Sequence, residues 1–143
     1  MKILKTIIAI LLFGATVHAQ NKHFNNLDEV KAFTEKSVKL IADENYEKAF
    51  DSMSKYWDIS KDDLKVFAEN TAHSLAPVKL KFGSTIGYSK IKDDKISDFF
   101  IRETYIVRYN MYAIRYLFTY YKNNDGWVLF RFTWDDKIDI EFN

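Results

Sequence analysis

MYAIRYLFTYYKNNDGWVLFRFTW, residues 111–134, consists of two aromatic-rich runs around the segment Asn123–Asn124–Asp125–Gly126. Asn and Gly tolerate the left-handed backbone conformations that tight turns demand, so this segment is typical of a hairpin turn. On either side of it, residue types alternate with the two-residue period of a β-strand. The stretch therefore predicts two antiparallel strands, at residues 112–121 and 127–134.

The same period extends in both directions along the chain. FIRETYIVRY, residues 100–109, predicts a further strand. Upstream of it, GYSKIKDDKISDFF predicts one strand, a turn at Asp93–Asp94 and a second strand that begins near Ile96. KIDIEF, residues 137–142, predicts a short last strand. Five or six strands are therefore expected.

Each predicted strand has one apolar face and one mixed face, because successive side chains point to opposite sides. The apolar face is expected to pack against helices and to form the core. It comprises Ile101, Glu103, Tyr105, Val107, Tyr109, Tyr112, Ile114, Tyr116, Phe118, Tyr120, Val128, Phe130, Phe132 and Trp134. The mixed face carries arginine, threonine and leucine together with Trp127, so most aromatic rings and the arginines fall on opposite faces.

Three amphipathic helices are expected before the strands, because apolar residues recur there at helical spacing. The first begins after Asn26, a capping residue that is followed three positions later by Glu29, as in a capping box. The second covers residues 46–57. The third starts at Ser60, and Pro77 is expected to kink or end it. Helices followed by an antiparallel meander predict an α+β fold.

The N-terminus, MKILKTIIAILLFGATVHA, has the features of a secretory signal peptide. Two lysines precede an apolar run, and Val17 and Ala19 form a small-x-small cleavage pattern. The run is shorter than the roughly 20 apolar residues of a transmembrane helix. We therefore expect residues 1–19 to be removed and residues 20–143 to form one soluble, exported domain.

The chain contains no cysteine. Disulfides, thiolate metal ligands, a thiol nucleophile and the lipid-modified cysteine of bacterial lipoproteins are therefore excluded. Export without cysteines fits a bacterial periplasmic or secreted protein. Since the chain also has only 3 histidines, neither a transition-metal site nor a cofactor is expected.

Charge and strand number argue against two other classes of protein. The sequence has 21 basic and 20 acidic residues, whereas nucleic-acid-binding domains are strongly basic. Aromatic side chains can stack on bases, but here they lie opposite the arginines that would hold phosphates. An outer-membrane barrel needs about eight strands or more. We expect no nucleic-acid partner, and no membrane contact once the signal peptide is removed.

The order of these features resembles a known superfamily. Two or three helices before an aromatic-rich antiparallel sheet are similar to the cone-shaped, cystatin-like α+β fold of nuclear transport factor 2, ketosteroid isomerase and polyketide cyclases. GYSKI, FIRETYIVRY, AIRYLFTYYK and GWVLFRFTWDD resemble small exported bacterial domains of unknown function in that superfamily. The likeness covers residues 26–136 and implies a strongly curved sheet around a conical pocket. It implies no activity, because the superfamily includes enzymes, binding modules and structural domains.

The resemblance also implies which residues would line the cone. Ketosteroid isomerase-like members place an acidic base and a tyrosine donor there. The residues that match by chemistry are Glu103, Tyr105, Tyr116 and Tyr120, and Trp134 is expected to add to the pocket wall. A lone carboxylate such as that of Glu103 must be paired, lie near the sheet end or face a polar cavity. No catalytic motif of the family coincides with these positions.

The mixed face has two interpretations. Members of the superfamily often pair sheet to sheet, and a wet homodimer interface would suit the side chains of this face. These are Arg102, Arg108, Arg115, Leu117, Trp127 and Arg131. Alternatively, the face is solvated and its long side chains cover apolar stems.

Two functional hypotheses follow. The first is an exported, non-enzymatic domain that binds a small apolar or aromatic ligand in the cone, or acts through a dimer surface. The second is a cofactor-free isomerase, dehydratase or cyclase with Glu103 as base and tyrosines as donors. An open cavity at Glu103 would favour the enzyme, whereas an interior filled by side chains would leave the interaction domain.

Overall fold

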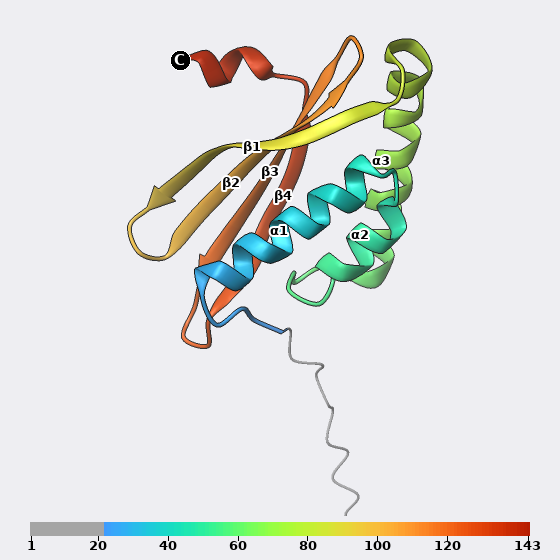
Figure 1. Cartoon of the computed structure of the whole chain (residues 1–143). Helices are drawn as coiled ribbons and strands as arrows, with labels where there is room; N and C mark the ends of the chain where they lie inside the picture. Colours follow the sequence, from blue (N-terminus) through green and yellow to red (C-terminus); the bar gives the residue numbers. More distant parts are fainter. Residues whose placement is uncertain (1–21) are drawn as a thin grey trace, which may run out of the picture.

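The computed structural model describes residues 22–143 (Figure 1). The predicted signal peptide, residues 1–19, lies outside these residues. Three helices come first: α1 (Leu27–Ala42), α2 (Tyr46–Met53) and α3 (Lys61–Phe82). The strands β1 (Thr85–Ile96), β2 (Phe100–Tyr109), β3 (Ala113–Lys122) and β4 (Trp127–Asp135) follow, and then the short 3-10 helix η1 (Ile138–Phe142). The predicted α+β class is confirmed.

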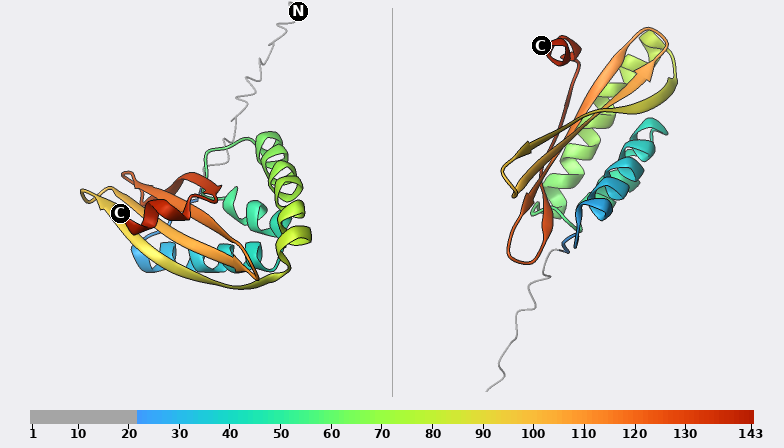
Figure 2. Two further views of the ribbon diagram at one scale, coloured as in Figure 1. Left: turned by 90° about the horizontal axis from the view of Figure 1, so that it is seen from above. Right: turned by 60° about the vertical axis from the view of Figure 1, so that its left-hand side comes forward.

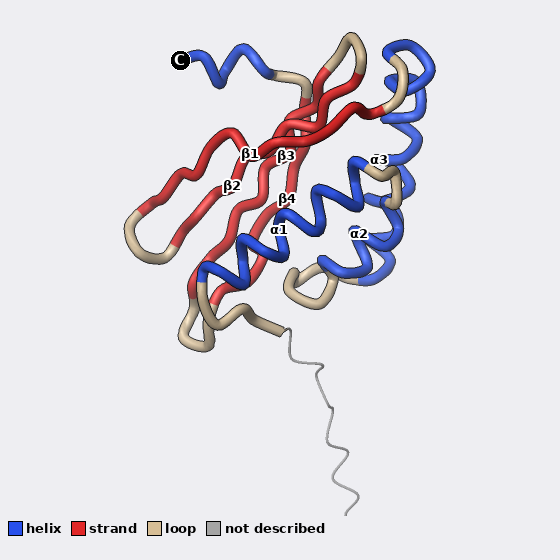
Figure 3. Tube along the Cα trace, viewed as in Figure 1, coloured by secondary structure: helices blue, strands red, loops and turns tan. Residues whose placement is uncertain are grey.

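The strands form one antiparallel sheet in the order β1-β2-β3-β4, so each strand pairs with the next along the chain (Figure 3). Figure 2 shows that the sheet is strongly twisted and curves around the helices. α1 contacts β1 and β2, and α2 packs between α1 and α3. The helices therefore cover one face of the sheet, which we call the inner face. The opposite side is the outer face.

The helix starts follow the sequence. Asn26 caps α1, since its side chain accepts a hydrogen bond from the Glu29 backbone N–H at 3.0 Å. The Glu29 carboxylate in turn accepts from the backbone N–H of Asn25 at 2.8 Å. Ser60 caps α3 by accepting from the Asp63 backbone N–H at 3.0 Å. Each cap satisfies backbone donors that have no partner within the helix.

The β3–β4 hairpin has its turn at the predicted residues. The Asn123 backbone N–H donates to the Gly126 carbonyl at 2.9 Å, and the Asn123 side chain accepts from two backbone N–H groups of the turn. Gly126 has a φ of 149°, and a Cβ at this position would lie 2.5 Å from the Phe24 carbonyl oxygen. A larger residue would therefore displace the N-terminal segment, which forms an antiparallel bridge from Phe24 to Trp127.

The predicted turn at Asp93–Asp94 is absent, and the third helix does not end at Pro77. β1 continues through Asp93–Asp94, and the chain reverses only after Ile96. The pairing of β1 with β2 has a register shift between Lys90 and Lys92, and the Asp93 carboxylate lies 3.0 Å from the Lys90 ammonium on the same strand. α3 is continuous across Pro77, which is exposed, so water can satisfy the carbonyl that the proline leaves without a partner.

The predicted last strand is also wrong. Residues 138–142 form η1 instead. Ile140 and Phe142, which were expected on an apolar strand face, are 51% and 85% exposed. Glu141 points the other way and contacts Arg115 on the outer face of β3. This ion pair favours a helical turn over the outer face instead of a fifth strand at the sheet edge.

Phe130 interrupts the register between β3 and β4. Leu129 and Arg131 pair with adjacent residues of β3, so Phe130 is one extra residue, a β-bulge. An extra residue reverses which side chains face inward. As a result, Trp127 and Leu129 are 6% and 2% exposed, whereas Phe130 is 51% exposed. The predicted faces are wrong for this half of β4 and right from Phe132 onward.

The inner face of β2 and β3 forms the core, as the alternation predicts. Its side chains, each at most 5% exposed, are Ile101, Glu103, Tyr105, Val107, Tyr109, Ile114, Tyr116, Phe118 and Tyr120. Val30, Thr34, Ser37, Val38 and Ile41 of α1 pack against them. Within residues 22–143, no helix combines the length and apolar character needed to cross a lipid bilayer.

Candidate functional site

Four of the expected pocket residues lie together on the inner face. Glu103 and Tyr105 come from β2, and Tyr116 and Tyr120 come from β3, where Tyr105 pairs directly with Tyr116. Glu103, Tyr116 and Tyr120 are 0% exposed and Tyr105 is 5% exposed. Trp134 lies on β4, opposite Tyr116 in the register, and is half-buried.

The Glu103 carboxylate is buried with one oxygen paired and the other unpaired. The Lys90 ammonium on β1 binds its Oε1 and also lies 3.0 Å from Asp93. Oε2 has no hydrogen-bond partner among the described residues. Burial lowers the pKa of Lys90, but its hydrogen bonds to Glu103 and Asp93 outweigh that effect, so the net shift is upward. Lys90 is therefore protonated at neutral pH, and its ammonium balances the charge of the buried Glu103 carboxylate.

The buried hydroxyls of the inner face and of α1 differ in their partners. Thr34 of α1 donates to the Val30 carbonyl at 2.9 Å, so its oxygen accepts from the Tyr120 hydroxyl at 2.7 Å. The Tyr116 hydroxyl and the Ser37 Oγ are buried with no partner among the described residues. Together with Glu103 Oε2, these are three buried polar atoms in one core without a hydrogen-bond partner. Each costs folding free energy unless another group satisfies it.

Burial raises the pKa of these phenols. It raises the pKa of Tyr105 to about 12, with Glu103 adding to the rise and Lys90 opposing it. Burial is also the largest cause of the raised pKa values of Tyr116 and Tyr120. At neutral pH the hydroxyls are therefore hydrogen-bond donors and not acids.

The interior around this cluster is filled by side chains. The Phe118 and Phe132 rings lie 4.8 Å apart, and those of Phe50 and Phe132 5.6 Å apart. Cavities of about 1010, 710 and 390 Å³ open on the surface of residues 22–143. Glu103, Tyr105, Tyr116 and Tyr120 line none of the three.

Trp134 belongs to a different place, between α3 and β4. Its indole N–H donates to Thr71 Oγ1 at 3.1 Å. It lines the cavity of about 390 Å³ together with Phe67, Asn70, Thr71, Ser74, Phe132 and Thr133. The structure thus brings four of the five expected pocket residues together and separates the fifth.

The residues expected at a dimer face also lie in different environments. Arg102, Arg108 and Arg131 are exposed on the outer face, where Arg102 donates to Thr119 Oγ1 at 3.1 Å. Leu117 is half-buried there. Trp127 faces inward because of the bulge, as described above.

Arg115 is on the outer face, but its guanidinium is already bound to carboxylates of the same chain. It is 7% exposed and binds Asp135 through two hydrogen bonds, at 3.0 and 2.8 Å. Glu141 of η1 accepts a third. The hydrogen bonds from Arg115 hold the pKa of the Asp135 carboxyl below its usual range. Arg115 therefore anchors the C-terminal helix and offers little to a partner.

An aromatic cluster on the outer face was missed by the sequence analysis. Phe99, Tyr121 and Phe130 are 45%, 37% and 51% exposed and surround the half-buried Phe100. Ring centroids lie 5.6 Å apart for Phe99 and Phe100, 5.1 Å for Phe100 and Tyr121, and 5.4 Å for Phe100 and Phe130. The doublet Tyr120–Tyr121 was the available signal, since adjacent strand residues point to opposite faces, whereas Phe99 lies in the turn before β2. We call these four residues the outer aromatic cluster.

Metal ligation has no support in residues 22–143, where no three His, Asp or Glu side chains gather at a common point. Glu103 on the inner face is instead paired with Lys90, and Asp135 and Glu141 are paired with Arg115 on the outer face.

No protein-family model and no curated protein matches the chain. Among solved structures, the fold is similar to that of a protein described as "Putative NTF2-like transpeptidase" from Campylobacter jejuni. The two chains are 16% identical, with a TM-score of 0.46, over 76% of this chain and 99% of the other. A similarity of this size concerns the fold alone, so the activity named for that protein is not transferred to this chain.

Proposed function

We propose that this protein is an exported, non-enzymatic interaction domain that pairs with a second copy of itself through the outer face of its sheet. The observation that carries the proposal is the outer aromatic cluster. Phe99, Tyr121 and Phe130 leave large apolar rings in water, next to Ile96, which is 67% exposed. Contiguous exposed apolar surface of this kind is typical of protein–protein contacts.

The surroundings of the cluster suit an interface. Arg102 on β2 and Arg131 on β4 flank it, each opposite Thr119 of β3, and the Arg131 guanidinium lies 5.8 Å from the centre of the Phe130 ring. Interfaces are enriched in aromatic residues and arginine relative to the rest of a protein surface. The bulge in β4 supports the same proposal, because it turns Phe130 outward at the cost of one unpaired position in the sheet.

The alternative of a small ligand inside the cone has less support. The inner face is occupied by its own side chains, and the three cavities described above lie elsewhere. An apolar ligand would need Tyr116, Phe118 or Phe132 to move out of a close-packed core. We therefore place the contact on the outer face.

Analytical ultracentrifugation tests the proposal. The chain without its predicted signal peptide, residues 20–143, should sediment as a concentration-dependent dimer, and Phe130→Glu should weaken dimerisation at least about tenfold because the charge would be buried in the contact. Leu80→Glu is the matched control, since Leu80 is 89% exposed on α3, away from the outer face. A monomer at all concentrations, or equal effects of the two variants, would contradict the proposal.

A second candidate function rests on the unpaired Oε2 of Glu103. A buried carboxylate oxygen without a partner can accept a proton from a substrate, and Tyr120 and Tyr105 are protonated donors nearby on the same face. Such an enzyme would be a cofactor-free isomerase, dehydratase or cyclase, and would require the core to open. A thermal-shift screen of small apolar and aromatic compounds on the wild type and on Glu103→Gln tests it. Compounds that stabilise only the wild type support a Glu103 role, whereas equal shifts or no shifts reject it.

A further inference from the structure

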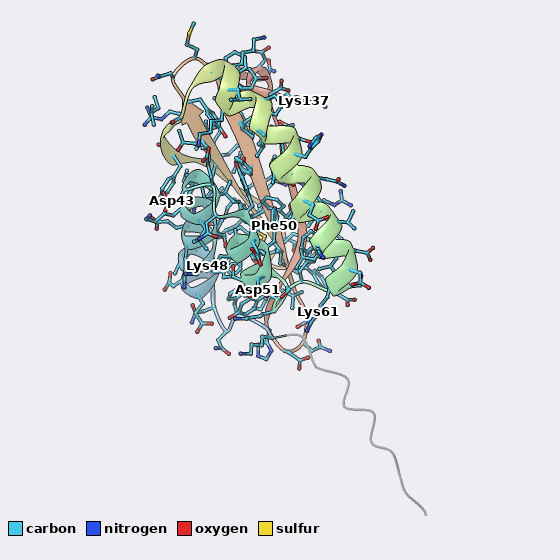
Figure 4. The ribbon with its side chains drawn as sticks, turned by 90° about the vertical axis from the view of Figure 1, so that its right-hand side faces the viewer. Asp43, Lys48, Phe50, Asp51, Lys61 and Lys137 are labelled. Atoms are coloured by element: carbon cyan, nitrogen blue, oxygen red, sulfur yellow. The ribbon has the colours of Figure 1, made fainter. Side chains whose placement is uncertain are left out.

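A groove runs between α2 and α3, on the side of the helical layer away from the sheet. It has a volume of about 710 Å³. Its floor is apolar and consists of Phe50 from α2 and Leu64, Ala68 and Ala72 from α3. The three α3 residues are spaced four apart, so they lie along one stripe of that helix. Figure 4 views the molecule from this side, with Phe50 and Asp51 on α2 and Lys61 at the start of α3.

The two rims of the groove differ in charge. Glu47 and Asp51 line it from α2, whereas α3 contributes Lys61 and Lys65 in its first turns and then Glu69. Within residues 22–143, the carboxylates of Glu47 and Asp51 and the ammonium of Lys61 form no ion pair, and Lys65 approaches only Glu69, at 3.9 Å. The groove is therefore an apolar channel between an acidic rim on α2 and a rim on α3 that is basic at its start, and Glu47, Asp51 and Lys61 are available to pair with a partner.

The acidic rim is unfavourable for α2 on its own. Glu47 lies in the first turn, where a negative charge suits the helix dipole, but it is one helical turn from Asp51, and like charges at this spacing destabilise a helix. Asp51 also lies in the last turn of an eight-residue helix, where a negative charge opposes the helix dipole. α2 has no basic residue in that turn, and Asn45 forms no side-chain capping bond at its start. A local arrangement that works against the fold is expected where a function requires it.

We propose that this groove binds an amphipathic helix of another protein. The helix would place an apolar stripe on the floor and two basic residues, four positions apart, against Glu47 and Asp51. Acidic residues on its other flank would face Lys61 and Lys65. The groove extends along the eight residues of α2, which is about 12 Å, so it accommodates about two turns of helix. This surface is separate from the outer face of the sheet, so the inference does not depend on the proposed homodimer.

A convex occupant is required by the shape of the surface. Two copies of this protein that met groove to groove would enclose an empty channel, and empty space at an interface forfeits packing contacts. A helix instead fills the channel with its own side chains. The small side chains of Ala68 and Ala72 allow a helix to approach α3 closely.

Binding of synthetic peptides tests the inference. The probes are fluorescent, stapled helices with one leucine stripe: a mixed peptide with a lysine flank and a glutamate flank, and an acidic peptide with glutamate on both flanks. Fluorescence anisotropy with the full domain should show the mixed peptide binding about three- to tenfold more tightly, because each exposed rim pair contributes modestly. In the double variant Glu47→Lys/Asp51→Lys, the preference should reverse toward the acidic peptide. The unfolding midpoint of this variant should stay close to that of the wild type, because two like charges remain four positions apart, and an unchanged midpoint would show that α2 remains folded.

Blocking the groove provides the matched control. Ala68→Trp should fill the floor and abolish binding, whereas His73→Trp, at an exposed position of α3 that does not line the groove, should leave binding unchanged. Lack of saturable binding by either peptide up to about 1 mM, the weakest affinity expected of so small a contact, would overturn the inference. So would binding that Ala68→Trp leaves intact, or a peptide preference that the charge reversal does not change.

Discussion

Tyr116 and Tyr120 are both fully buried on β3, yet only the hydroxyl of Tyr120 has a partner. Removing a buried hydroxyl that has no partner relieves a desolvation penalty, so Tyr116→Phe should stabilise the protein by about 1 kcal/mol. Tyr120→Phe loses its hydrogen bond to Thr34 and should destabilise by about 1 kcal/mol. Urea unfolding of the two variants measures both effects. Destabilisation by Tyr116→Phe would show that its hydroxyl has a partner in solution, such as a bound water or ligand.

Lys90 is expected to be the most important charged residue of the inner face. Lys90→Met would leave the 0%-exposed Glu103 side chain as a buried carboxylate without a cation, which should cost about 3 kcal/mol of unfolding free energy. Lys92→Met is the control, because Lys92 is half-exposed and its contact with Asp94 is 3.5 Å long, so the expected change is below about 0.5 kcal/mol.

Chemical denaturation of a third variant completes this test. Lys90→Met/Glu103→Leu should recover most of the loss, because an apolar pair can replace a buried ion pair at little cost. Equal stabilities of Lys90→Met and Lys92→Met would contradict the view that Lys90 compensates Glu103.

Among the elements, η1 is held to the sheet mainly by Arg115. Arg115→Met should release η1 and leave Asp135 without its cation, at a cost of about 2 kcal/mol near neutral pH. Because Arg115 lowers the folded-state pKa of Asp135, this stabilisation is present above the unfolded value near pH 4 and is lost as pH falls through the folded value. The stability difference between wild type and variant should therefore shrink below about pH 4.

Denaturation between neutral and acidic pH, together with limited proteolysis, measures this. Arg108→Met is the control, since Arg108 is exposed on the same face and makes no ion pair within residues 22–143. A pH-independent difference, or a C-terminus cut no faster in Arg115→Met than in Arg108→Met, would contradict the anchoring role.

Regular elements were predictable from local signals, and irregular ones were not. The caps at Asn26 and Ser60 and the turn at 123–126 depend on residues within a few positions of one another. The bulge at Phe130 depends on how β4 aligns with β3, and no residue type within β4 predicts it. η1 depends on a contact between Glu141 and Arg115, which are 26 positions apart.

The same distinction applies to the candidate sites. Alternation placed Glu103, Tyr105, Tyr116 and Tyr120 on one face correctly, because that needs only the strand period. Whether they line a cavity depends on the packing of helices against the sheet, which the period does not specify. The α2–α3 groove was likewise not predictable, since Glu47 and Asp51 look like any solvated charges until α3 is placed beside them. Sequence thus determines faces, whereas tertiary packing determines sites.

The aromatic core as a whole makes the fold sensitive to alkali. Tyr105, Tyr109, Tyr116 and Tyr120 are at most 5% exposed, and burial raises the pKa of each, in the case of Tyr105 to about 12. A raised folded-state pKa contributes stability that is complete below the unfolded value near 10 and is lost as pH rises through the folded value. Above about pH 10 each such tyrosine should therefore remove roughly 1.4 kcal/mol of unfolding free energy per pH unit.

Urea unfolding between about pH 8 and pH 11, followed together with tyrosinate absorbance, measures this loss. Stability should be nearly level up to about pH 9.5 and then fall steeply, with these four buried tyrosines forming tyrosinate only as the protein unfolds. Tyr105→Phe should make the fall shallower by one tyrosine's share, whereas Tyr56→Phe, at a half-buried position outside this group, should change the slope less. Tyrosinate that forms near pH 10 for all tyrosines while the protein stays folded would show that the inner face is open to water, and so would favour a cavity at Glu103 over the packed core described here.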